Sequence, residues 1–130
     1  MSAVLTLAFD AVDALPAIDA MNDDTLDDLD FGVIGIDADG AVRRYNAPES
    51  RMAGLSPHRV LGQPMFTSVA PCMNNFMVAQ RLDDAMMLGE ALDVTIDYVL
   101  TLRMKPVKVK LRLLAAPGAA LRYVLVLRPA

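Results

Sequence analysis

Residues 92–113, LDVTIDYVLTLRMKPVKVKLRL, carry the pattern that decides the fold. Apolar side chains alternate with mostly polar ones over residues 94–102, and the same alternation returns over residues 107–113. A repeat of two residues is typical of a β-strand with one buried and one solvated face. The dipeptide PG at 117–118 then predicts a turn into a last strand, LRYVLVLR at 121–128. The C-terminal part of the chain therefore predicts three antiparallel strands in a meander.

Two further strands and a helical connection precede this meander. The segment FGVIGIDADGAVRRYN (31–46) has apolar runs on either side of the turn signal DADG, which predicts a hairpin. Glycines and prolines over residues 54–71 favour short helices, and apolar residues at helical spacing before Gly89 predict one longer helix. The sequence thus predicts an α+β fold, a five-stranded antiparallel sheet with short crossover helices on one face. We expect a ligand cavity between these helices and the sheet.

The N-terminal segment differs from the rest in its charge. The first 42 residues hold ten aspartates and no lysine or arginine. In MNDDTLDDLDFG (21–32) the acidic residues are interleaved with apolar ones, which predicts short helices with acidic first turns. We therefore expect a helical N-terminal cap over residues 1–30 outside the sheet and a core over residues 31–130. Cap and core together make a single domain.

Composition limits the kind of protein that this chain can be. A hydrophobic share of 55% and a charged share of 22% are typical of a globular domain. The first residues lack the basic region of a signal peptide, and no apolar run approaches the roughly 20 residues of a membrane span. Cys72 is the one cysteine, which excludes an internal disulfide. We expect a cytoplasmic protein that does not enter a membrane.

Five basic residues of the meander could attract a nucleic acid. The chain is acidic overall, with a net charge of −4, and no aromatic residues interleave with these charges. We expect them to form the solvated face of a strand, with no nucleic-acid partner. They are Arg103, Lys105, Lys108, Lys110 and Arg112.

The chain lacks the sequence patterns of an enzyme or of a metal site. His58, the sole histidine, is predicted in a loop without a second histidine or a carboxylate cluster. There is no glycine-rich phosphate loop and no nucleophile elbow. Cys72 in VAPCMNN (69–75) has no histidine near it in the sequence, which argues against thiol catalysis. We expect no enzymatic activity, no catalytic residue and no metal.

The segment YNAPES (45–50) allows two interpretations. Asn46 is suited to cap a helix with Pro48 in its first turn and Glu49 at its third position, which is a capping-box arrangement. Glu49 is equally suited to be a buried functional carboxyl, and the residues alone leave both roles open. Tyr45 fits a position at the core edge. Cys72, taken by itself, is compatible with an inert core residue.

Taken together, these segments resemble a known family. LDFGVIGIDADGAVRRYNAPE (29–49), VLGQPMFTSVAPC (60–72) and RMKPVKVKL (103–111) are similar, in order and spacing, to the photoactive yellow proteins. The similarity runs from about Met21 to Leu127, and YNAPE and VAPC are its most specific parts. The resemblance implies a PAS fold and a blue-light photoreceptor.

The resemblance also implies a role for four residues. In that family the cysteine of the APC motif, here Cys72, holds 4-hydroxycinnamic acid (p-coumaric acid) through a thioester. The phenolate accepts hydrogen bonds from the tyrosine and the glutamic acid that match Tyr45 and Glu49, and Met104 matches a methionine that assists the return to the dark state. A buried phenolate needs such donors, and Glu49 donates only when it is protonated, which burial beside a second anion favours.

Signalling in this family starts with the trans-to-cis isomerisation of the chromophore. Proton transfer from Glu49 would then leave a buried carboxylate whose desolvation drives a rearrangement, and the loosened N-terminal cap is the expected output. We expect a downstream signalling protein of unknown identity as the partner, and a monomer or weak homodimer.

Some positions depart from the family pattern. Ala53 replaces a threonine that usually bonds the tyrosine, and Leu55 replaces an arginine that covers the ring. Met65 and Leu100 stand where aromatic residues are usual. These departures favour an alternative function, a PAS-type sensor or interaction module that binds another small ligand, such as haem, or no chromophore.

Overall fold

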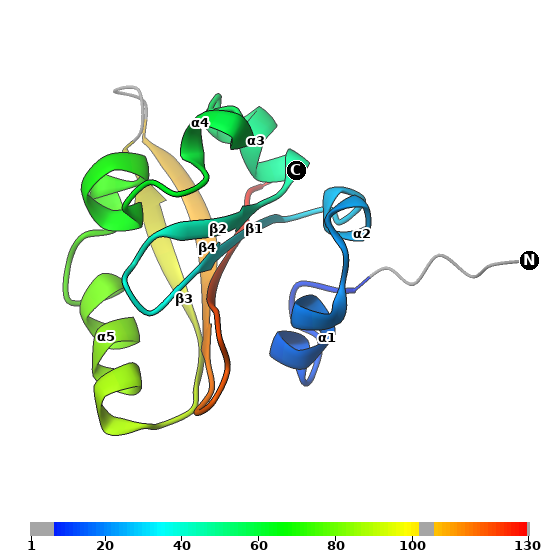
Figure 1. The fold of residues 1–130 in the computed structure, drawn as a ribbon. Helices are drawn as coiled ribbons and strands as arrows, with labels where there is room; N and C mark the ends of the chain where they lie inside the picture. Colours follow the sequence, from blue (N-terminus) through cyan, green and yellow to red (C-terminus); the bar gives the residue numbers. More distant parts are fainter. Residues whose placement is uncertain (1–6, 102–105, 130) are drawn as a thin grey trace, which may run out of the picture.

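A five-stranded antiparallel sheet forms the centre of the computed structural model, which describes residues 7–101 and 106–129 (Figure 1). The strand order is β2-β1-β5-β4-β3, so the first hairpin joins the meander through the pairing of β1 with β5. The predicted architecture is confirmed. The strands are β1 (Gly32–Ile36), β2 (Val42–Tyr45), β3 (Leu92–Leu100), β4 (Val107–Ala115) and β5 (Arg122–Leu127).

Short helices make up the crossover between β2 and β3, as the glycines and prolines predicted. The longer helix ends at Gly89, whose φ of 64° lies in the left-handed region that glycine adopts without strain. Two helices precede the sheet, α1 (Ala14–Ala20) and α2 (Asp23–Asp27). The crossover contains α3 (Ala47–Ala53), α4 (Pro57–Val60), a π-helical turn (Met65–Val69), a 3-10 turn (Pro71–Met73) and α5 (Ala79–Leu88).

The helices cover the two faces of the sheet in separate groups (Figure 1). We name the face that carries Ile34 and Leu113 the crossover face, because α4, α5 and the crossover turns pack on it. We name the face that carries Val33 and Tyr123 the cap face, because α1 and α2 pack on it.

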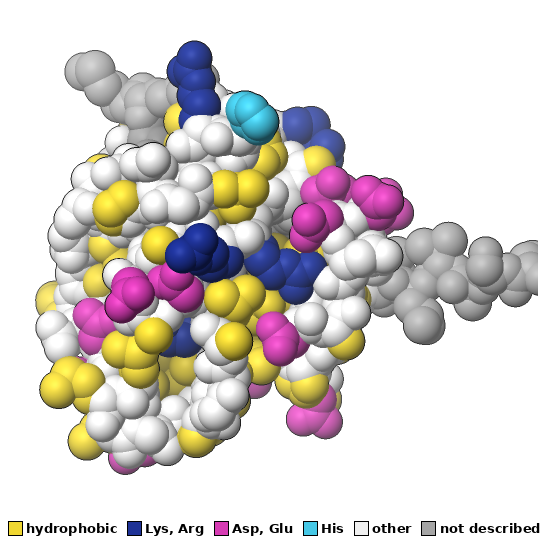
Figure 2. Space-filling view, viewed as in Figure 1, with side chains coloured by type: hydrophobic (Ala, Val, Ile, Leu, Met, Phe, Trp, Pro, Cys, Tyr) yellow, Lys and Arg dark blue, Asp and Glu magenta, His cyan; other side chains and the backbone are white. Residues whose placement is uncertain are grey.

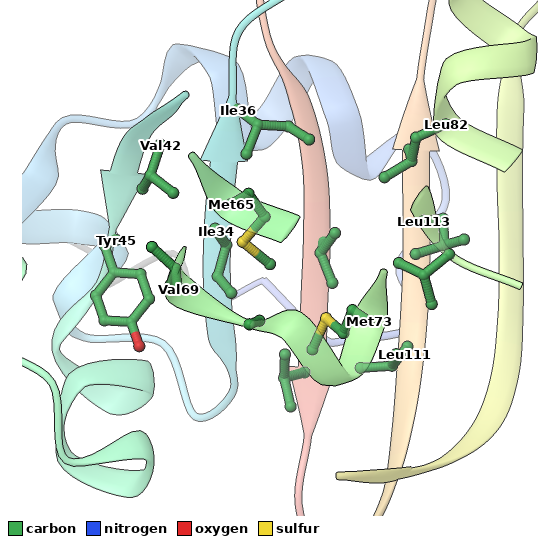
Figure 3. Packing of buried hydrophobic residues seen from close by; sticks show 14 of the residues in the cluster. Ile34, Ile36, Val42, Tyr45, Met65, Val69, Met73, Leu82, Leu111 and Leu113 are labelled. Carbon is green, nitrogen blue, oxygen red and sulfur yellow. The ribbon is translucent and has the colours of Figure 1, made fainter. Parts of the chain in front are cut away.

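Methionines of the crossover turns fill the core on the crossover face. Met65 and Met73 are fully buried and lie over the sheet among Ile34, Leu111 and Leu113 (Figure 3). Their flexible side chains suit an irregular space between two layers. This packing fixes the turn that carries Cys72 against the sheet.

On the cap face, Arg112 holds the beginning of the described chain. Its Nη1 donates to the backbone carbonyls of Phe9 at 2.9 Å and Ala11 at 2.8 Å, and its Nη2 pairs with Asp93 at 2.7 Å. The prediction that Arg112 lies on a solvated face is wrong, because the cap covers its guanidinium.

A second cap-face arginine, Arg44 of β2, binds the helix α1 in the same way. Its Nη1 donates to the carbonyl of Ile18 at 3.0 Å, and its Nη2 donates to the carbonyl of Met21. Tyr123 of β5 accepts from Arg44 at 3.3 Å and donates to Asp19 at 2.8 Å. Guanidinium groups therefore anchor the cap mainly through backbone carbonyls.

The surface agrees with several other expectations. Acidic side chains gather on the cap around α2 (Figure 2). The single histidine, His58, is exposed as expected, but it lies in α4 and not in a loop. Lys108 and Lys110 are exposed on β4. Arg103, Met104 and Lys105 lie outside the described residues. Within residues 7–101 and 106–129, no helix is both long and apolar enough to span a bilayer.

Candidate functional site

Two of the expected site residues lie where β2 ends and α3 begins. Tyr45 is the last residue of β2, and Asn46 caps α3 by accepting from the backbone N–H of Glu49 at 3.2 Å. Pro48 in the first turn favours a helix that starts at this point. Strand end and helix start together bring Tyr45 and Glu49 into one neighbourhood.

Glu49 is a buried carboxyl with a cationic partner. Only 2% of the residue is exposed, and its carboxylate binds the Arg128 guanidinium through Nη1 to Oε1 at 2.6 Å and Nη2 to Oε2 at 3.2 Å. The capping box is only half formed, because Asn46 caps the helix while the Glu49 side chain turns to Arg128. The structure thus shows a buried carboxyl in place of a complete capping box, and the functional role of Glu49 stays a prediction.

The β1 strand leaves room for this carboxyl only because it starts with glycine. A Cβ added to Gly32 would collide with Glu49 Oε1 and lie 3.1 Å from Glu49 Cβ. Burial raises the pKa of Glu49, and the Arg128 guanidinium acts against that rise by stabilising the carboxylate.

Tyr45 is buried beside this ion pair. Within the described part of the chain its hydroxyl has no hydrogen-bond partner. Burial raises the pKa of Tyr45, the Glu49 charge raises it further, and Arg128 lowers it. The three residues Tyr45, Glu49 and Arg128 therefore form one electrostatic cluster, although no hydrogen bond joins the phenol to the carboxylate.

Cys72 lies in the 3-10 turn, half-buried and packed against the core of the crossover face. The Tyr98 hydroxyl donates to the backbone carbonyl of Cys72 at 2.5 Å, and Asn75 Nδ2 donates to that hydroxyl at 2.5 Å. Asn75 Oδ1 also accepts from the backbone N–H groups of Met77 and Val78 before α5. The thiol thus sits on a turn that β3 and the start of α5 hold in place.

Three residues around the site were not predicted to belong to it. Arg128, Tyr98 and Asn75 appear in the sequence as a strand-end cation, one of a row of alternating strand residues, and a loop amide. Nothing local distinguishes them from surface residues, because their partners lie 79, 26 and 23 positions away in the chain.

The remaining site positions are apolar. Ala53, Met65 and Leu100 are buried, and Leu55 is half-buried against the crossover-face core. Met104 lies outside the described residues. In the part of the chain that the structure describes, no group of histidine, cysteine or acidic side chains could hold a metal ion.

Comparison with known proteins agrees with this geometry. The family model of the PAS fold matches residues 20–129. The photoactive yellow proteins of Rhodothalassium salexigens and Halochromatium salexigens are 36% and 38% identical to the chain over 93 residues. Each alignment covers 72% of this chain and 74% of the relative. The chain belongs to the photoactive yellow protein family.

A solved structure of the same family has the same fold. The photoactive yellow protein domain of the sensor histidine kinase Ppr from Rhodospirillum centenum superposes with a TM-score of 0.78 at 37% identity. The match covers 85% of this chain and 96% of that domain. Membership of the photoactive yellow protein family supports a photoreceptor or sensor role and implies a covalently bound chromophore. The cap boundary at residue 30 stays a prediction.

Proposed function

We propose that this chain is a blue-light photoreceptor domain that carries 4-hydroxycinnamic acid as a thioester on Cys72. The observation that carries this proposal is the hydroxyl of Tyr45, which donates to no described residue and belongs to a largely buried side chain beside the buried carboxyl of Glu49. This hydroxyl is available as a donor, and a phenolate would accept a charge-assisted hydrogen bond from it. The donor set therefore fits the group.

Cys72 is suited to form the thioester. An activated hydroxycinnamoyl ester would lose its leaving group while the Cys72 Sγ, as thiolate, forms the bond to the carbonyl carbon. Tyr98 and Asn75 hold the backbone of the turn, so the thiol is presented from a fixed position. Cys72 is half-buried and packs against the crossover-face core, so we propose that a group attached to its sulfur lies on this core.

Tyr45 and Glu49 are the proposed phenolate donors. Charge-assisted O–H···O⁻ bonds are strong, and in a buried site they offset the desolvation of the anion. Glu49 donates only as a carboxylic acid, and burial already favours that form. Bound there, the chromophore supplies light absorption and a trans-to-cis isomerisation.

The proposed output is the N-terminal cap. Asn46 Oδ1 accepts from Glu49 N, and Asn46 Nδ2 donates to the carbonyls of Leu26 and Phe31 at 2.9 and 3.0 Å. Loss of the Glu49 proton would disturb the start of α3, and Asn46 would pass that disturbance to the cap. For Met104 we keep the role implied by the family, assisting the thermal return.

Intact mass measures the covalent step directly. Wild-type chain incubated with an activated hydroxycinnamoyl ester is expected to gain one hydroxycinnamoyl group and become yellow, while Cys72→Ser stays unmodified. A folded wild-type protein with a reactive thiol that gains no mass would overturn the proposal.

Absorption tests the donors. In the loaded protein, Glu49→Gln is expected to shift the band to the red, because an amide is a weaker donor than a carboxylic acid to a phenolate. An unchanged band would show that Glu49 does not contact the chromophore.

A second candidate is a PAS-type module that binds another small ligand or none. Ala53 favours it, because alanine has no hydroxyl to bond Tyr45, and so does Leu55, which has no charge with which to cover a ring. Titration with haem, read as a shift of the Soret absorption band, distinguishes this candidate from the first. Haem binding by a chain that does not take the hydroxycinnamoyl group would establish it.

A further inference from the structure

Arg128 follows the last residue of β5 and reaches back to Glu49. Two guanidinium nitrogens face two carboxylate oxygens, at 2.6 and 3.2 Å. The two side chains are only 10% and 3% exposed. A fork-to-fork contact of this kind is typical of an ionised carboxylate. The arrangement therefore stabilises Glu49 as an anion.

Few other charged or titratable groups lie next to the Glu49–Arg128 ion pair on β2, α2 and β1. Tyr45 of β2 is the titratable group that senses both partners. The neighbouring helix α2 contributes Asp27, whose carboxylate is engaged by the backbone N–H of Ala47 at 2.7 Å. The adjacent start of β1 contributes Gly32 and no charge.

Charged side chains lie near Arg128 in a surface groove. Arg128 lines a groove of about 250 Å³ together with Asp97, Lys108 and Lys110. Asp97 and Lys110 pair with each other at 2.9 Å. Within the described ranges, Arg128 is the cation that makes an ion pair with Glu49, and it also borders this groove.

One buried cation balances one buried anion. A phenolate held by Tyr45 would be a second anion close to Glu49, and two anions with one guanidinium would leave a net charge in a poorly solvated site. Protonation of Glu49 restores neutrality, with the guanidinium left to balance the phenolate.

We propose that Arg128 is a positioning residue that keeps Glu49 ionised until a second anion enters beside Tyr45, and that it then balances this anion while Glu49 takes up a proton. The inference rests on the proposed function, because the second anion is the phenolate. It gives Glu49 two roles, an ion-pair partner of Arg128 and a neutral donor. It also connects each change of charge on Glu49 to the end of β5.

Carbon-13 NMR of the glutamate carboxyls tests, without any chromophore, whether Arg128 keeps Glu49 ionised. The sequence contains two glutamates, Glu49 and the exposed Glu90, so labelled glutamate gives one site signal and one internal control. Removal of a cation in contact with a carboxylate raises its pKa, so Arg128→Gln should move the Glu49 midpoint upward by about 1–3 pH units. The Glu90 signal serves as the internal reference.

Arg128→Lys is the matched control, because lysine keeps the positive charge but cannot form the two parallel hydrogen bonds of the guanidinium with the carboxylate. It is expected to bring the Glu49 midpoint back toward the wild-type value, which a purely structural role of the arginine would not do. Equal Glu49 midpoints in wild type and Arg128→Gln would overturn the inference.

The protein that carries the hydroxycinnamoyl group tests whether Glu49 takes up a proton when a second anion is present. At neutral pH the Glu49 signal should change from carboxylate to carboxylic acid when the hydroxycinnamoyl group is attached. A loaded, yellow protein whose Glu49 remains a carboxylate would overturn the inference and leave the covalent attachment standing. If the chain does not load at all, the proposed function fails, and an unshifted midpoint in the unloaded titration would then overturn the control by Arg128 as well.

Discussion

Arg112 on the cap face and Arg128 on the crossover face both have little-exposed side chains, but their acceptors differ. On the cap face, Arg112 donates to backbone carbonyls of Phe9 and Ala11 and to Asp93, whose side chain is 52% exposed. On the crossover face, Arg128 faces Glu49, whose side chain is 3% exposed. Carbonyls do not titrate, whereas a buried carboxyl does. We therefore expect the Arg128–Glu49 pair to respond to a proton, and the contacts of Arg112 with the carbonyls of the cap to be independent of one.

The largest expected effect comes from removing the cation on the crossover face. Arg128→Gln leaves Glu49 buried without a counter-ion, which should cost about 3–5 kcal/mol of unfolding free energy near pH 8. The pKa of Glu49 is raised, so its contribution to stability is fully present below its unfolded value and declines as the pH rises through the folded value. The loss should therefore be smaller near pH 5. Urea unfolding at both pH values measures it.

The double variant Glu49→Gln with Arg128→Gln is the control for that measurement. Removing both charges leaves neutral amides, so most of the stability at the higher pH should return. A loss that is the same at both pH values would show that the ion pair is not its source.

The corresponding change on the cap face is Arg112→Gln. It orphans two backbone carbonyls, and we expect a loss of about 2–3 kcal/mol. Arg112 lowers the pKa of Asp93, so the stability from that pair is present above the unfolded value of Asp93 and is lost as the pH falls through its folded value. Between about pH 5 and pH 8 the loss should be constant. A loss that varies strongly over this range would remove the contrast between the faces.

Two glycines of β1 give a matched pair on one strand. Gly32→Ala forces a methyl onto Glu49 Oε1 and should cost about 2 kcal/mol, with a pH dependence like that of Arg128→Gln. Gly35→Ala meets Tyr123 Cε1 at 3.0 Å and Arg44 Cβ at 3.1 Å on the cap face, and should cost about 1 kcal/mol at any pH. Thermal unfolding at two pH values compares them. Identical pH behaviour would contradict the assignment of the titrating group to one face.

The smallest effect concerns one tyrosine hydroxyl on each face. Tyr98→Phe removes the donor to the Cys72 carbonyl, a loss of about 1 kcal/mol that should raise the rate of thiol modification by roughly fivefold. Tyr123→Phe removes the contacts with Arg44 and Asp19 and should leave that rate unchanged. Kinetics with a disulfide reagent measure both. Equal acceleration in the two variants would show that the Tyr98 contact does not specifically order the turn.

Local patterns were sufficient to predict most of the fold. The alternation of apolar and polar residues over 92–113 predicted the two long strands β3 and β4, and Gly89 predicted the end of α5. Both features depend on residues that are close in the chain. The family motifs, rather than local physics, joined Cys72 to Tyr45 and Glu49. Alternation alone did not separate Arg112 from Lys110, because both lie on the cap face of β4 and the cap covers only the part of that face near Arg112. Residues about 100 positions away decide how far this cover extends.

The partner of Glu49 could not be predicted for a related reason. Arg128 is 79 residues away, and it meets Glu49 only because β5 pairs beside β1. The half-formed capping box shows the same limit. A glutamate at the third helical position has a local partner available, and tertiary contact with Arg128 prevails over it.

The Asn46 side chain is hydrogen-bonded both to the N-terminal cap and to the start of α3, which carries Glu49. Its buried amide accepts from Val33 N and Glu49 N and donates to the carbonyls of Leu26 and Phe31. These four partners fix which end is oxygen and which is nitrogen. The two amide protons of this side chain should therefore exchange slowly with solvent and give a resolved pair of NMR signals. That single resonance pair is a built-in reporter, in which detachment of the cap and a change at Glu49 can be followed in the same spectrum.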